Sequence, residues 1–422
     1  MAVTTTASTA VAFTPSWGSR LAGMEGLRAL AALAVATVHT HDFLTGGLAW
    51  GPVGAAAGVA LNGLMLFFAL SGFLLYRPFA TALLDAAAPP RIGAYAVNRV
   101  LRIYPAYLVV LLLVSVVLGV ANRIPFSIDG ADRGPLIGRT TDPLVLVTDA
   151  TLLHTLFPFS MRTGLEVSWS LTVELVFYAV MPLMALAALR WRPGIARGRH
   201  AWIRAFVPVV TLLAIGVAAK VVKYLLFAGL PEDSDFYHHW GANWYAVLAR
   251  SFPVHADLFA FGMAAAVLVA AFESGLVKPR LLRVFRGTAT GIALFALLAA
   301  FILPTMLRDT AVAAASGGLI LVVATPASTR GPGILARALE AWPLRSAGLV
   351  SYSFYLWHLP VIWFVGMHGW AGPPTWAGFA RDLVVVLTVS LALAAATYLL
   401  VERPALRLKR RTDARAGALA SG

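Results

Sequence analysis

Long apolar stretches alternate along the chain with shorter segments that hold most of the polar residues. Each stretch is a nearly unbroken run of Ala, Val, Leu, Ile and Phe, long enough to cross a hydrocarbon layer that takes roughly 20 helical residues. The pattern predicts helices over ten ranges: 26–44, 57–76, 101–121, 167–189, 203–228, 255–272, 288–304, 311–326, 346–366 and 383–402. The expected fold class is therefore all-α, a polytopic transmembrane bundle of about ten helices.

Composition agrees with a chain whose solvent is the lipid bilayer. The 422 residues are 59% hydrophobic and only 12% charged, whereas a soluble domain carries about 25% charged residues. Cysteine is absent, which excludes disulfides, thiolate metal sites and cysteine-bound acyl intermediates. We expect no metal and no permanently bound cofactor. The net charge of +14 raises the question of a nucleic-acid partner, but the placement of the charges argues against one.

Most Lys and Arg residues fall in alternate loops and in the two tails. If the N-terminus is inside, these are the inner loops, and the asymmetry follows the positive-inside rule for an even number of crossings. We therefore expect a multi-pass protein of the plasma membrane with both termini cytoplasmic. Residues 1–22 lack the features of a signal peptide and are predicted to be a disordered tail, 23–405 the transmembrane domain, and 406–422 a basic cytoplasmic tail.

The two longest outer loops, 122–166 and 229–254, are rich in acidic residues. Together they contain Asp129, Asp132, Asp142, Asp149, Glu232, Asp233 and Asp235. We expect these loops to lie at the mouth of a site that faces outward.

The first predicted helix carries two titratable residues on one face. Arg28 and His39 are eleven residues apart, and at 100° per residue this separation is about 20° from three full turns, with roughly 16 Å along the axis. An ionisable group within a span is costly and usually faces a cavity or a partner. His39 is a candidate general base; alternatively, it hydrogen-bonds across helices and Arg28 snorkels to the inner interface.

The fourth predicted helix carries a polar stripe. Ser170, Glu174 and Tyr178 follow an i, i+4, i+8 pattern and so share a face. The estimated depth of Glu174 matches that of His39, and a carboxylate beside an imidazole orients it and raises its basicity. The alternative is a glutamic acid that burial keeps neutral.

Arg99 and Arg102 stand in the inner loop before the third predicted helix. Three residues apart, they can lie on one face and bind phosphates, or they are ordinary positive-inside charge. His358 is a second intramembrane histidine, predicted either to pack or to contact substrate. Ser71-Gly72 predicts close helix packing, and Glu402 is predicted to be a structural anchor at the inner interface.

Together these features resemble the acyltransferase 3 family of bacterial membrane acyltransferases, from Gly23 to Pro404. The resemblance is carried by Arg28-x10-His39, Phe67-Phe68-x-Leu70-Ser71-Gly72-Phe73, Arg99-x-x-Arg102-Ile103-x-Pro105, Ser168-Trp169-Ser170-Leu171-x-x-Glu174-x-x-Phe177-Tyr178, Tyr352-Ser353-x-Tyr355-Leu356-Trp357-His358 and Glu402-Arg403-Pro404. Each motif is common alone, whereas their order together is specific.

The resemblance implies transfer of an acetyl or other short acyl group from acyl-CoA, used as a co-substrate, to a hydroxyl of a glycan, a lipid-linked sugar or a secreted natural product. It implies that His39 is the catalytic histidine, that Arg28 supports donor binding, and that Arg99 and Arg102 meet the CoA phosphates. Glu174 is the second catalytic candidate, and Ser170, Tyr178 and His358 are candidate substrate contacts. Direct attack by the acceptor and an acyl-histidine intermediate both remain open.

A transporter in which Arg28, His39 and Glu174 form a proton or substrate relay is the main rival interpretation. The paired arginines, and the lack of two matching halves with interrupted helices, favour the enzyme. A structural scaffold explains none of the titratable residues within the spans.

Overall fold

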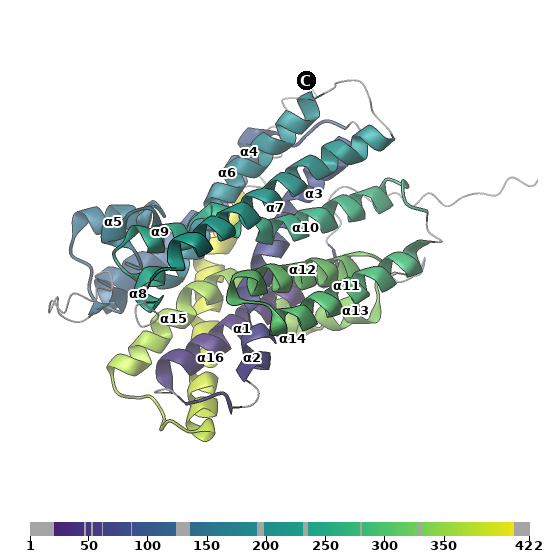
Figure 1. The fold of residues 1–422 in the computed structure, drawn as a ribbon. Coiled ribbons are helices and arrows are strands. Elements are labelled where there is room, and N and C mark those ends of the chain that lie inside the picture. The colour runs from purple at the N-terminus through teal and green to yellow at the C-terminus, as the bar shows by residue number, and fades with distance from the viewer. Residues whose placement is uncertain are drawn as a thin grey trace, which may run out of the picture.

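The computed structural model describes residues 21–45, 48–51, 54–60, 62–85, 87–123, 136–191, 198–230, 235–278, 281–326 and 331–408. These residues are almost entirely helical, which confirms the all-α class (Figure 1). The elements in chain order are α1 (Met24–Leu44), α2 (Gly54–Ala60), α3 (Gly63–Asp85), α4 (Ile92–Leu112), η2 (Leu113–Leu118), β1 (Ala121–Asn122), β2 (Ile137–Gly138), α5 (Pro143–Ala150), η3 (His154–Leu156), η4 (Pro158–Ser160), η5 (Glu166–Ser168), α6 (Trp169–Arg190), α7 (Arg199–Phe227), α8 (Asp235–Trp240), α9 (Trp244–Ala249), α10 (Phe252–Glu273), α11 (Leu282–Ile302), α12 (Thr305–Ala324), α13 (Ile334–Leu339), α14 (Trp342–Leu349), α15 (Ser351–Met367), α16 (Trp376–Thr397) and η8 (Tyr398–Glu402). The two short strands pair antiparallel, with Ala121 opposite Gly138.

Every one of the ten predicted ranges contains a helix, although not all of them pass as membrane spans. Within the described residues, eight helices are long and apolar enough to cross a membrane, or nine if α14 and α15, which are bent by 75°, form one broken span. The first predicted span, α1, is not among them, because it carries several polar side chains, including Arg28, His39 and Asp42. The protein is thus a multi-pass helical membrane protein.

Helix ends differ from the prediction most clearly around the expected inner loop between α3 and α4. α3 continues to Asp85, and α4 begins at Ile92 instead of residue 101, so that Arg99 and Arg102 lie within a helix. Hydropathy marks the apolar part of a helix and misses polar turns that extend it. Arg77, also predicted in a loop, lies in α3 and forms an ion pair with Glu273 of α10 at 2.6 Å.

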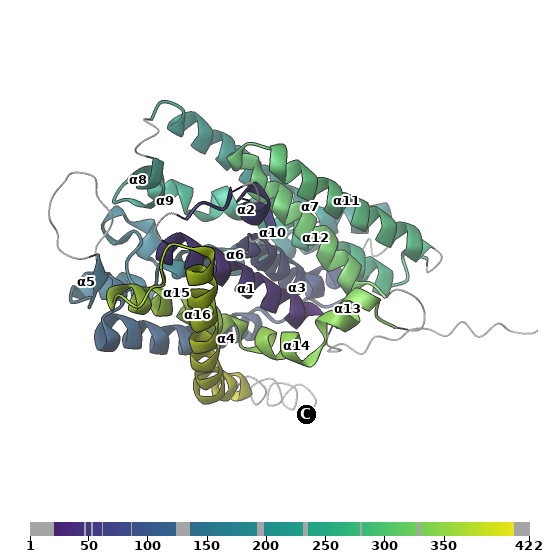
Figure 2. The same ribbon diagram turned by 90° about the horizontal axis from the view of Figure 1, so that it is seen from below.

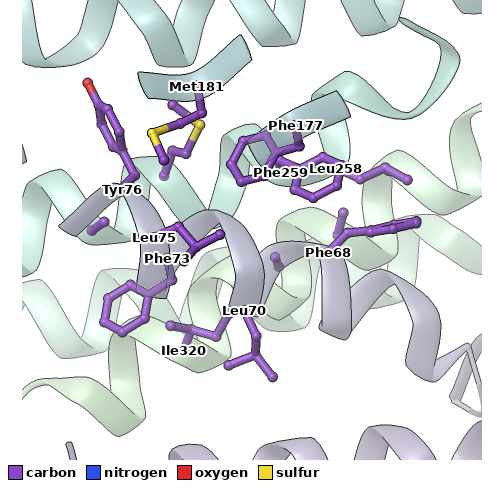
Figure 3. Packing of buried hydrophobic residues seen from close by; sticks show 14 of the residues in the cluster. Phe68, Leu70, Phe73, Leu75, Tyr76, Phe177, Met181, Leu258, Phe259 and Ile320 are labelled. Atoms are coloured by element: carbon purple, nitrogen blue, oxygen red, sulfur yellow. The ribbon is translucent and has the colours of Figure 1, made fainter. Parts of the chain in front are cut away.

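The centre of the core is the contact between α3 and α10, which close backbone approach makes possible. A Cβ atom on Gly72 would lie 2.2 Å from the Phe259 carbonyl oxygen, and one on Gly262 would lie 1.8 Å from that of Ala69. Glycine at both positions is therefore required by packing, as predicted for Ser71-Gly72. Figure 3 shows the aromatic and aliphatic side chains that fill the surrounding space, from α3, α6, α10 and α12: Phe68, Leu70, Phe73, Leu75, Tyr76, Phe177, Met181, Leu258, Phe259 and Ile320.

α1 runs through the bundle between two groups of helices. α15 and α16 pack against it on one flank, while α12 with α11 lies toward the other (Figure 2). The short helices α5, α8 and α9, which come from the two predicted outer loops, gather at one end of the bundle (Figure 1). Asp142 accepts hydrogen bonds from the backbone N–H groups of Leu144 and Val145 and thereby caps α5.

Several predictions lie outside the described residues. They are the N-terminal tail up to residue 20, the basic tail from residue 409, and the acidic residues Asp129, Asp132, Glu232 and Asp233.

Candidate active site

Five helices enclose a cavity whose polar lining is dominated by arginine. It has a volume of about 100 Å³, below the roughly 300 Å³ at the lower end of small-molecule sites. Its polar and aromatic lining comes from α1, α3, α4, α6 and α15: Arg28, Phe67, Phe68, Ser71, Arg99, Arg102, Ser170, Glu174, Tyr178, Ser351, Tyr352 and Tyr355. Six of the eight candidate residues from the sequence therefore meet here.

Among the residues that the structure describes, Arg102 is the one of the three cavity arginines that donates a hydrogen bond to a carboxylate. Its Nη1 atom donates to Oε2 of Glu402 at 2.7 Å, and Ser353 donates to the other oxygen of the same carboxylate. Its guanidinium also lies 5.5 Å from the centre of the Tyr352 ring. The predicted anchor Glu402 is thus the counter-ion of a predicted donor-binding residue.

Arg28 and Arg99 present a different situation. The Nε atom of each is buried and has no hydrogen-bond partner within the described part of the chain. The Arg99 guanidinium lies between aromatic rings, 5.9 Å from the centre of Tyr95 and 5.7 Å from that of Tyr178. A buried cation whose donors are unsatisfied is costly, and an anion in the cavity removes that cost.

Glu174 lines the arginine cavity and does not contact His39. Its carboxylate accepts a hydrogen bond from Ser71 and lies beside the Tyr178 hydroxyl. It is an electrostatic neighbour of Arg28. The predicted pairing of Glu174 with His39 is therefore corrected: equal estimated depth in the membrane does not place two side chains on facing sides of their helices.

His39 is instead paired with His358. Its Nδ1 atom lies 2.9 Å from Nε2 of His358, and the two rings are nearly parallel, with an angle of 14° between their planes. The Nδ1 atom of His358 lies 2.7 Å from the backbone oxygen of Tyr355. His39 is partly exposed, whereas His358 is completely buried.

The histidine pair adjoins the arginine cavity but does not line it. Tyr355 lies between them: its side chain lines the cavity, its ring centre is 5.5 Å from that of His358, and its hydroxyl is 2.9 Å from the hydroxyl of Ser170. The Phe67 ring packs edge to face against the Tyr355 ring, with 5.9 Å between the ring centres. Arg28 and His39 were expected to share one face toward the ligand, but only Arg28 reaches the cavity.

Sequence reasoning missed the roles of Glu402, Ser353 and Tyr355. Tyr355 and His358 are three residues apart, and that helical spacing was a usable signal for a contact between them. Arg102 and Glu402 are 300 residues apart, and no local pattern points to that pair. Within the described residues, no group of three or more His, Cys, Asp or Glu side chains could hold a metal ion.

The fold and the cavity define a multi-pass membrane protein with a cationic internal site next to a histidine pair. The sequence profile described as "Acyltransferase domain" matches residues 21–399. The chain therefore belongs to the acyltransferase 3 family, which confirms the resemblance seen in its motifs.

Two curated relatives are similar to parts of the chain. A peptidoglycan O-acetyltransferase, OatA, of Listeria monocytogenes is 25% identical over 351 residues, which cover 80% of this chain and 49% of the relative. Protein 2 in the picA locus of Rhizobium radiobacter is 31% identical over 166 residues, which cover 37% of this chain and 78% of the relative. The chain thus spans about half the length of the Listeria protein. No solved structure matches.

Proposed function

We propose that the protein is a membrane O-acyltransferase that moves an acyl group, acetyl or another short chain, from acyl-CoA to a hydroxyl of a glycan, a lipid-linked sugar or a secreted natural product. One observation carries the proposal: two arginines whose buried Nε donors have no hydrogen-bond partner among the described residues line a cavity, and beside that cavity stands a histidine whose Nε2 has no partner in the same part of the chain. Membership of the acyltransferase 3 family supports it.

In this proposal, Arg28 and Arg99 bind phosphate groups of CoA. Guanidinium groups bind phosphate oxygens through short charge-assisted hydrogen bonds, and the Nε donors of both residues are free within the described chain. Arg102 contributes positive charge to the same wall while it remains bound to Glu402. The small volume of the cavity fits one segment of the donor, so the rest of CoA extends beyond it.

The thioester then reaches His39 past Phe67 and Tyr355. His39 takes the proton of the acceptor hydroxyl while the acceptor oxygen attacks the thioester carbonyl. The new C–O bond forms as the C–S bond breaks, and the proton passes from His39 to the departing thiolate of CoA. In the acyl-histidine route, the same nitrogen attacks the carbonyl first and the C–S bond breaks to release the CoA thiolate. The acceptor oxygen then displaces the histidine from the acyl group, and the hydroxyl proton passes to the thiolate. Rapid quenching with labelled donor distinguishes the two routes by label on His39.

A carbohydrate hydroxyl is the proposed acceptor class. The name of the Listeria relative, a peptidoglycan O-acetyltransferase, supports it. The end of the bundle that carries α5, α8 and α9 belongs to the predicted outer loops and is the proposed side of acceptor entry.

We also propose that both termini are cytoplasmic, with the donor entering from that side. The distribution of arginines between alternate loops supports this orientation. Because the chain has no cysteine, Asn98→Cys gives a single reactive thiol on α4, one residue from Arg99. In sealed vesicles, acyl-CoA should protect this thiol from a thiol reagent only when the acyl-CoA is added on the cytoplasmic side. Protection only by acyl-CoA added on the other side would show that the proposed orientation is wrong.

The decisive experiment supplies purified protein in nanodiscs with radiolabelled acetyl-CoA and glycan, lipid and metabolite extracts of the host. Label should move to a hydroxyl-bearing product with the wild-type protein. His39→Ala should lower transfer by 10² to 10⁴-fold without loss of thermal stability. Retention of more than about a tenth of the activity excludes His39 as the base. Uptake of solute into sealed vesicles without covalent transfer supports the rival transporter.

A further inference from the structure

His358 is the polar residue next to His39, and its burial favours the first of its two predicted roles, packing, over substrate contact. Its side chain is 0% exposed and does not line the cavity. Both ring nitrogens nevertheless have partners, Nδ1 with the Tyr355 carbonyl and Nε2 with Nδ1 of His39. A fully buried side chain with two specific partners acts on the site through those partners.

The direction of these hydrogen bonds follows from the chemistry of the groups. A carbonyl oxygen only accepts, so Nδ1 of His358 must carry a proton and donate it to Tyr355. An imidazolium at this buried position would be an uncompensated charge, since the hydrogen-bond partners of His358 are a carbonyl and a second imidazole. His358 is therefore neutral, and its Nε2 offers a lone pair.

The position of the proton on the His39 ring follows in the same way from its partner. With an acceptor at 2.9 Å, Nδ1 of His39 must be the donor, which leaves Nε2 of His39 unprotonated. The near-parallel rings, 5.1 Å apart at their centres, let the N–H bond point along the lone pair of the neighbouring ring. No described residue provides a hydrogen-bond partner for Nε2 of His39.

We infer that His358 is a positioning residue that holds His39 in the tautomer with Nδ1 protonated and Nε2 free to accept the acceptor's proton. The Tyr355 carbonyl determines which nitrogen of His358 carries the proton, and His358 in turn determines which nitrogen of His39 does. One turn of α15 therefore sets which ring nitrogen of His39 is basic. This inference rests on the proposed role of His39 as general base. It replaces the predicted pairing with Glu174 by a neutral partner, which orients the ring without adding charge to the buried site.

The test compares three variants of the full-length protein in nanodiscs. His358→Phe keeps a planar ring but removes the nitrogen that accepts the hydrogen bond from His39. We expect kcat to fall about 10 to 100-fold, the usual effect of losing a residue that orients a functional histidine. KM for acetyl-CoA should change less than about twofold, since the donor cavity is untouched. His358→Gln places an amide oxygen that accepts from His39, and it should recover most of the lost kcat.

His368→Phe is the matched control. Nδ1 of His368 donates to the backbone oxygen of Phe364 at 2.8 Å, but this residue lies at the exposed end of α15 and does not contact His39. Its kcat should equal that of the wild type. If His358→Phe keeps wild-type kcat, or if His358→Gln is as inactive as His358→Phe, the positioning role is wrong, while loss of activity in His39→Ala still upholds the proposed function.

A direct measurement on the wild type covers the case in which the variants misfold. Solid-state NMR of protein labelled with ¹⁵N-histidine, with the His39 signals assigned by their loss in His39→Ala, reports which ring nitrogen carries the proton. We expect a protonated Nδ1 and a bare Nε2 in the resting protein. The opposite tautomer, or a doubly protonated ring, overturns the inference whatever the kinetics show.

Discussion

Two groups of charged side chains lie within the apolar bundle, and they differ in whether their charges are paired. Lys220 of α7 donates to Asp257 of α10 at 2.5 Å and to Thr310 of α12 at 2.6 Å, and Thr310 donates to the same carboxylate oxygen. Arg28 and Arg99 instead leave buried donors without a partner in the described chain. The first group joins three helices, whereas the second lines a cavity.

The comparison shows that a charge inside a membrane span is not by itself a sign of a binding site. Lys220 and Asp257 neutralise each other, although Oδ1 of Asp257 accepts no hydrogen bond from any residue that the structure describes. Their pairing accounts for their presence as a tie between helices. The guanidinium groups of Arg28 and Arg99 cannot lose their charge by deprotonation, so their Nε donors, which lack a partner in the described chain, require a ligand or solvent.

The largest effect is expected from Arg28→Gln combined with Arg99→Gln. Charge-assisted hydrogen bonds contribute about 1.5 to 3 kcal/mol each, so the affinity for acyl-CoA should fall about a hundredfold or more. The melting temperature should not fall, because the change removes buried Nε donors that have no hydrogen-bond partner in the described chain. Binding of labelled acyl-CoA and a thermal melt, both in detergent, check the two halves of the prediction.

Arg190→Gln is the control for that double change. Arg190 is exposed at the end of α6. Its replacement should change the affinity for acyl-CoA by less than about twofold, because an exposed surface charge contributes less than about 1 kcal/mol. Equal losses in the control and the double variant mean that the arginines act only through the net charge of the inner surface, and the donor site must then be sought elsewhere.

Lys220→Met should show the opposite behaviour, with a loss of stability and no loss of affinity. Leaving Asp257 buried without its cation costs about 3 to 5 kcal/mol, whereas Lys220→Met with Asp257→Leu removes both charges and should recover most of the melting temperature. Acyl-CoA affinity of the folded fraction should stay at the wild-type value. A large drop in acyl-CoA affinity at unchanged stability would instead assign Lys220 and Asp257 to ligand binding.

Arg102 is the intermediate case, because it lines the cavity and is also paired with Glu402. Arg102→Gln should lower both acyl-CoA affinity, by about tenfold or less, and the melting temperature. Glu402→Gln should lower the melting temperature while it leaves affinity within about threefold. If Glu402→Gln instead weakens binding as much as Arg99→Gln, the carboxylate takes part in the donor site.

The sequence was sufficient for the helical ranges and for the cationic candidates, but not for their partners. Apolar runs and costly charges are local signals, and they led to Arg28 and His39, while the three-residue spacing of Arg99 and Arg102 indicated a pair on one face. The partner of His39 is 319 residues away in the chain and that of Arg102 is 300, distances over which helical periodicity carries no information. Asp257 was overlooked, although a carboxylate inside the apolar run of α10 is the same kind of local signal as Arg28 in α1.

Asp149 extends the comparison to an unpaired buried carboxyl group outside the predicted spans. It is 1% exposed in α5, and Oδ1 accepts a hydrogen bond from Thr163 at 2.7 Å, while Oδ2 has no partner in the described chain. Burial raises the pKa of Asp149 to about 7, and the Thr163 hydrogen bond opposes that shift. A carboxyl group can therefore escape the cost of an unpaired charge by taking up a proton, which an arginine cannot do.

The smallest expected effect follows from that pKa. Between the unfolded value of 3.8 and the folded value of about 7, the folded state holds a proton that the unfolded state has lost, so stability must fall as pH rises through this window and then level off. At about 1.4 kcal/mol per pKa unit, the change between pH 6 and pH 8 is on the order of 1 kcal/mol. Asp149→Asn keeps an oxygen for Thr163 and removes the titration, so its melting temperature should exceed that of the wild type by more at pH 8 than at pH 5. Melts at four pH values in detergent measure the difference, and parallel curves for the two proteins would show that Asp149 folds with its charge intact and has a counter-ion still to be found.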